Sequence, residues 1–84
     1  MLNSDLVKTS GEINPNTIDS SQNIKGYYTE PGTGYQYLFL QIVSTFSAQI
    51  IILNTTGESK IAYRIKLSNG VPFGEAVWTW IANK

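Results

Sequence analysis

The chain has 84 residues, equal numbers of acidic and basic side chains, and neither cysteine nor histidine. Disulfide bonds, thiol chemistry and the usual zinc ligand sets are therefore excluded, and the lack of a basic patch argues against binding of nucleic acid or anionic lipid. A domain this small usually needs some added stabilisation, and its charged content of 14%, against roughly 25% in typical globular chains, favours association with further copies of itself.

Residues 1–23 are rich in Asn, Ser, Thr and Asp, which favour turns and local side-chain-to-backbone hydrogen bonds. We expect a polar linker or the end of a stalk here. Leu2, Leu6 and Val7 leave room for one helical turn of a coiled coil. The segment has no basic start followed by a long apolar run, so no signal peptide is expected.

Five β-strands are predicted after this segment, because runs of β-branched and aromatic residues alternate with Gly, Pro and Asn turns. They cover residues 24–30, 35–43, 48–54, 61–67 and 75–82. Between residues 37 and 53 the apolar sequence is interrupted by Gln and Ser, which favours two strands over one membrane-spanning helix. No convincing helix is predicted.

The strand at residues 61–67 alternates cleanly between apolar and mixed positions. Its apolar side holds Ile61, Tyr63, Ile65 and Leu67, and its other side holds Ala62, Arg64 and Lys66. We expect the side with the two cations to face solvent. The strands at 35–43 and 48–54 are instead apolar on both sides, which indicates that both faces of the sheet are covered.

The last strand places Trp78 and Trp80 on one face and Val77, Thr79 and Ile81 on the other. Either orientation would expose a large apolar area in a monomer. We therefore predict that at least one of the two tryptophans is largely buried, in the core or against another subunit. The fold expected for residues 24–84 is all-β: a small antiparallel β-sandwich or knob of about five strands, assembled as a trimer.

Catalysis is not expected. Most carboxylates fall in polar segments or loops, no two form a pair on one strand face, and Ser-His-Asp and Cys-His arrangements are impossible. No metal site and no cofactor are predicted. The aromatic side chains are the stronger functional signal, because flat rings suit sugar faces and protein interfaces, although core packing and cross-strand pairing suffice to explain most of them and are the favoured explanation. The candidate ligand-binding residues are Tyr35, Tyr37, Arg64 and Trp80. Arg64 could clamp a carboxylate or phosphate, but an Arg at such a position is more often a solvated side chain or half of a weak surface ion pair.

Four short motifs, in this order, resemble the small β knobs of phage tail fibres and pyocin fibres. An Asn-rich opening with Asn14 and Asn16 leads to Gly26-Tyr27-Tyr28. A Gln followed by apolar residues and Asn spans residues 49–54, an aromatic-Arg pair follows at Tyr63-Arg64, and residues 73–82 close with two tryptophans. The resemblance covers roughly residues 14–82.

This resemblance implies a non-catalytic, homotrimeric receptor-binding knob of a phage tail or tail-like particle. Its implied partners are other tail or baseplate proteins and a glycan or protein of the host cell surface. Two alternatives remain open: a structural trimerisation or connector domain of a fibre, and a carbohydrate-binding module of a secreted protein. A strictly monomeric mass in solution would favour the carbohydrate-binding module over the two fibre domains. Binding to a glycan or to host cells would favour the receptor-binding knob over the structural connector.

Overall fold

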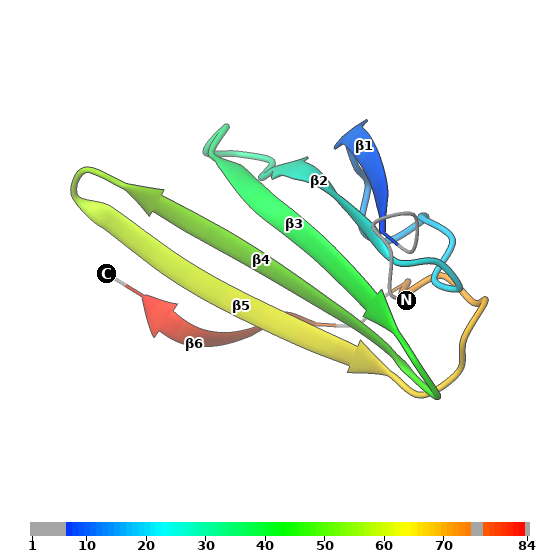
Figure 1. Ribbon diagram of the computed structural model, residues 1–84. Coiled ribbons are helices and arrows are strands. Elements are labelled where there is room, and N and C mark those ends of the chain that lie inside the picture. The colour runs from blue at the N-terminus through cyan, green and yellow to red at the C-terminus, as the bar shows by residue number, and fades with distance from the viewer. Residues whose placement is uncertain (1–6, 75–76, 84) are drawn as a thin grey trace.

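The computed structural model describes residues 7–74 and 77–83, and this part of the chain forms one sheet of six strands without a helix (Figure 1). The all-β class expected from the sequence is confirmed. The sheet is the single one formed by the described residues, and its strands lie side by side in chain order. They are β1 (Lys8–Glu12), β2 (Ile24–Thr29), β3 (Gln36–Val43), β4 (Ser47–Thr55), β5 (Glu58–Lys66) and β6 (Thr79–Asn83).

Strands β2 to β6 are antiparallel neighbours and correspond to the five predicted strands. Strand β5 begins three residues earlier than predicted, at Glu58, because Thr55 pairs directly with Glu58. Only Thr56 and Gly57 remain as the turn, and Gly57 has a φ of 87°, which a glycine adopts without steric cost. The last strand was predicted to begin at residue 75, but β6 begins at Thr79: residues 77 and 78 are not in a strand, and residues 75 and 76 lie outside the described residues.

Strand β1 corrects the expectation that residues 1–23 form a linker. Residues 8–12 pair with β2 in parallel, whereas only antiparallel pairing was expected. The sequence hides this strand because all five of its residues are exposed and it has no apolar alternation. From Lys8 onward the N-terminal segment is thus part of the same folded unit; Leu2 and Leu6 lie outside the described residues.

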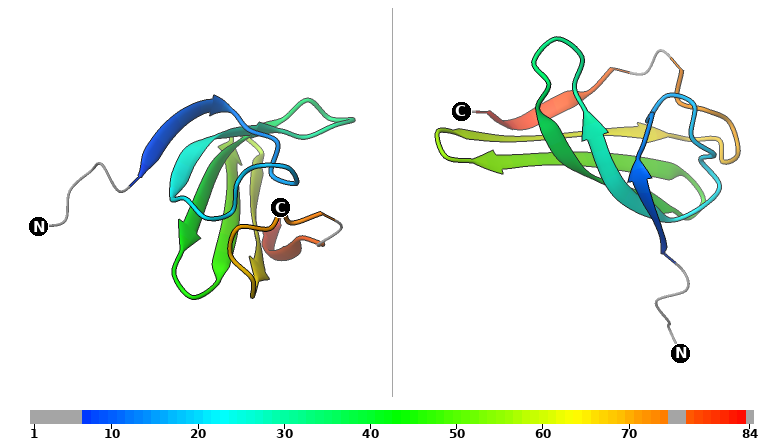
Figure 2. Two further views of the ribbon diagram at one scale, coloured as in Figure 1. Left: turned by 90° about the vertical axis from the view of Figure 1, so that its right-hand side faces the viewer. Right: turned by 90° about the horizontal axis from the view of Figure 1, so that it is seen from above.

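The sheet is strongly curled. The ring centroids of Tyr28 on β2 and Trp78, just before β6, are 6.3 Å apart. In a flat sheet, strands four positions apart are separated by about 19 Å. The curl brings the two ends of the sheet together over one face, here called the inner face, as the two views in Figure 2 show.

The inner face carries the core, which includes Tyr37, Phe39, Ile51, Leu53 and Ala62. Residues 13–23 lie across this face, and Ile13 joins the core. A row of buried polar side chains on the sheet binds residues 13–23, here called the covering segment. Gln49 Nε2 donates to the carbonyl oxygen of Pro15 at 2.9 Å, and Gln41 Nε2 donates to that of Asp19 at 2.9 Å.

The orientation predicted for β5 was wrong. Ala62 and Arg64 are buried on the inner face, while Ile65 on the opposite side is 52% exposed. Arg64 tolerates burial because its Nε donates to Gln49 Oε1 at 2.8 Å and its guanidinium carbon lies 4.3 Å from the Trp78 ring centroid. The apolar side of β5 therefore faces outward, so the described residues cover only one face of the sheet.

None of the described residues forms a helix that is long and apolar enough to span a membrane.

Candidate functional site

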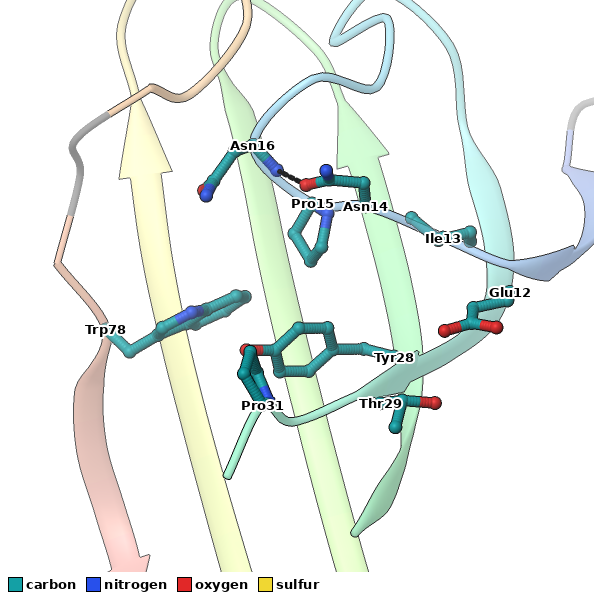
Figure 3. A pocket seen from close by; sticks show the side chains of 9 residues that line it. All are labelled: Glu12, Ile13, Asn14, Pro15, Asn16, Tyr28, Thr29, Pro31 and Trp78. Atoms are coloured by element: carbon teal, nitrogen blue, oxygen red, sulfur yellow. Dashed lines mark hydrogen bonds between the residues drawn. The ribbon is translucent and has the colours of Figure 1, made fainter. Parts of the chain in front are cut away.

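A pocket of about 290 Å³ opens on the inner face, between the N-terminal covering segment and the aromatic side chains of Tyr28 and Trp78 (Figure 3). Tyr28 projects from β2 and Trp78 from the segment before β6, so the curl of the sheet creates the pocket. Both rings are half-buried, and their planes are tilted by 32°. Pro31 adds a further flat apolar surface at the same side.

The opposite side of the pocket is polar. Asn14 Oδ1 accepts a hydrogen bond from the backbone N–H of Asn16 at 3.0 Å, which fixes the turn between them. Asn16 Oδ1 accepts from Arg64 Nη2 at 2.8 Å. Within the described chain neither side-chain nitrogen donates a hydrogen bond, so both amides keep their N–H donors for a ligand. The exposed carboxylate of Glu12 supplies an acceptor.

Arg64 supports both sides of this pocket from beneath. Its guanidinium contacts the rings of Trp78 and Phe73, with centroid distances of 4.3 and 4.7 Å, and it holds the Asn16 side chain. Burial lowers the pKa of Arg64 to about 10, which still leaves the side chain charged at neutral pH. A charged, hydrogen-bonded guanidinium has little freedom to move, so Arg64 fixes the positions of Trp78 and Asn16.

The structure separates the four predicted site residues. Arg64 lies below the pocket and is buried, so it is not available as the exposed clamp that the sequence predicted. Tyr37 is fully buried, and its hydroxyl donates to Glu30 Oε1 at 2.9 Å. Burial is the main reason that the pKa of Tyr37 lies well above its ordinary value, and this hydrogen bond raises the pKa further. Tyr37 therefore serves the core and offers no surface to a ligand.

Tyr35 and Trp80 lie near one another at the other end of the inner face. Lys60 Nζ is 5.5 Å from the Tyr35 ring centroid and 5.8 Å from that of Trp80. Trp80 is 40% exposed and also contacts the ring of Tyr37 at 6.2 Å. Neither residue lines the pocket. Trp78 and Trp80 do share the inner face, as predicted, and Trp78 is the more buried of the two.

The sequence interpretation missed Tyr28, Trp78, Asn14 and Asn16 as members of one site. Their residue types were informative, but Asn14 and Trp78 are 64 positions apart, and only the curl of the sheet brings their segments together. In the described parts of the chain, no three His, Cys, Asp or Glu residues gather in a way that would hold a metal ion.

Aromatic rings beside amide and carboxylate groups can bind a small ring that has one apolar face and several hydroxyl groups. The rings would stack on the apolar face, while the amides donate to hydroxyl oxygens and Glu12 accepts from a hydroxyl. The volume of this pocket, about 290 Å³, is close to the lower limit of the roughly 300–1,000 Å³ seen for ligand pockets.

Comparisons of the chain with protein-family models, with curated proteins and with solved structures find no match in any of the three.

Proposed function

We propose that this protein is a non-catalytic receptor-binding knob, assembled as a homotrimer, that attaches a phage tail fibre or tail-like particle to the host cell surface. The motif resemblance gives the class of protein. The pocket between Tyr28, Trp78 and the two asparagines carries the proposal, because its stacking surface and amide donors suit a neutral sugar unit of a surface glycan.

Binding to a panel of bacterial surface polysaccharides tests this proposal. The variant Trp78→Leu removes the stacking surface, and we expect it to weaken binding at least tenfold. Trp80→Leu is the matched control, because it makes the same change on the same face but outside the pocket. Circular dichroism and solution mass, measured for both variants, confirm that each remains folded and assembled.

Equal binding by the two variants would contradict the role of the pocket. If the wild-type protein bound none of the polysaccharides and adsorbed to no bacterial cells, a structural connector in the fibre would be the better interpretation. The uncovered apolar face of the sheet favours that second function, because a connector needs only assembly surfaces.

A further inference from the structure

The side of the sheet opposite the pocket, here called the outer face, is apolar and is not covered by the described residues of the chain. Nine outward-pointing side chains of β3, β4 and β5 form its centre: Leu38, Leu40, Ile42, Ala48, Ile50, Ile52, Ile61, Tyr63 and Ile65. None is buried, and Leu38 and Ile65 are more than half exposed. An apolar surface of this kind marks an interaction site in a soluble protein.

Strand register arranges these nine side chains as a grid. Leu38 lies opposite Ile52, which lies opposite Ile61, and the other two rows follow the same pairing. The outward positions of these three strands carry no charge along their whole length. Lys25 borders the grid on β2, where it pairs with Leu40.

The covering segments give no protection to this face. Residues 13–23 and the loop after β5 both lie on the inner side, where Ser20 Oγ donates to the carbonyl oxygen of Val71 at 2.6 Å and Gln49 donates to Pro15. Because the two segments bind one another and the inner core, neither is free to cover the outer face.

The size of the outer face matches what an interface between copies needs. Strands β2 to β6, spaced about 4.8 Å apart over a length of about 25 Å, give an upper limit of roughly 600 Å² for each copy, because the curl makes the outer face convex. Two such faces in contact bury at most roughly 1,200 Å², against the approximately 1,000 Å² expected of a specific interface. Identical faces without charge at their centre can also meet without like-charge repulsion.

We infer that copies of this chain pack their outer faces, centred on the grid of β3, β4 and β5, against one another. The inference deepens the proposed function by naming the surface through which copies meet, and it rests on that proposal only for the number of copies. The pocket lies on the inner face, so every copy keeps its pocket open in the assembly. Several pockets on one particle would bind a repetitive glycan with avidity.

Solution mass provides the first test. Sedimentation of the wild-type chain at about 100 µM should give a multiple of 9.3 kDa. The double variant Leu38→Lys/Ile65→Lys places two charges on the grid and should weaken association at least tenfold. Val71→Lys is the control, since Val71 is similarly exposed but lies on the inner-side loop, and it should keep the wild-type mass. A monomeric wild type, or a double variant with unchanged mass, overturns the inference.

A second test does not require the charged variant to fold. The chain contains no cysteine, so a single introduced thiol reports on its own position. Maleimide should modify Ile65→Cys at least tenfold more slowly than Val71→Cys when the protein is assembled. Equal rates in an assembled protein would show that copies meet through another surface, and would overturn the inference.

The results also separate this inference from the proposed function. A dimer that protects Ile65→Cys supports the outer-face interface but contradicts the proposed trimer. An assembled protein that binds no polysaccharide and no bacterial cell leaves the interface supported and contradicts receptor binding.

Discussion

Arg64 is the side chain on which the inner face depends most. It joins the polar row Gln41–Gln49 to the covering segment through Asn16, and it contacts the ring of Trp78. A buried cation is costly unless its donors are paired, and here two of its hydrogen bonds are 2.8 Å long. The residue therefore links the core, the covering segment and the pocket.

Arg64→Lys should lower the free energy of unfolding by about 2 kcal/mol, because an ammonium group cannot reproduce the fork of hydrogen bonds to Gln49 and Asn16. Urea unfolding at one protein concentration, followed by tryptophan fluorescence, measures this change. Lys8→Arg, an exposed cation on β1, is the control and should change stability by less than about 0.5 kcal/mol. Equal stability of Arg64→Lys and wild type would mean that the hydrogen-bond geometry contributes little.

Among the elements, β1 is the least expected and depends on one glycine. It lies parallel to β2, and its backbone crosses close to Gly26. A Cβ atom at Gly26 would lie 2.5 Å from the carbonyl oxygen of Gly11 and 2.5 Å from Ile13 Cδ1. Only a residue without a side chain permits this approach, so Gly26 is what allows the N-terminal segment to reach the pocket.

Gly26→Ala should destabilise the fold by about 2 kcal/mol, because β1 must move away from β2. Hydrogen exchange of the Lys8 and Ile13 amides, which donate to Asn23 and Tyr27, should also become faster. Gly11→Ala is the matched control on the partner strand, since a Cβ there meets no atom within 4 Å. If both variants exchanged at the wild-type rate, the close crossing of β1 would be contradicted.

At the scale of the whole molecule, the two faces of the sheet differ in how they are covered. The inner face is filled by its own chain and opens only at the pocket, whereas the outer face is apolar and open. A small domain without disulfides gains stability from partner subunits. Folding and assembly should therefore be coupled.

The melting temperature should accordingly rise with protein concentration, by about 4–8 °C for each tenfold increase, because unfolding then releases separate chains. Calorimetry between about 10 µM and 1 mM measures this dependence. The double variant Leu38→Lys/Ile65→Lys should melt at a temperature that changes little over the same range. A wild-type melting temperature that is constant with concentration would contradict coupled assembly.

The sequence by itself determined the all-β class, five of the six strands and the shared face of Trp78 and Trp80, because these depend on local alternation and turn residues. It also predicted that a single chain leaves apolar surface uncovered. Only the tertiary structure decided which side of β5 is buried, because the pairing of Arg64 with Gln49 and Asn16 is long-range and reverses the ordinary preference of a cation for water. The tertiary structure also decided the place of β1 and the pocket, since both depend on backbone approach and sheet curvature, which no local pattern encodes.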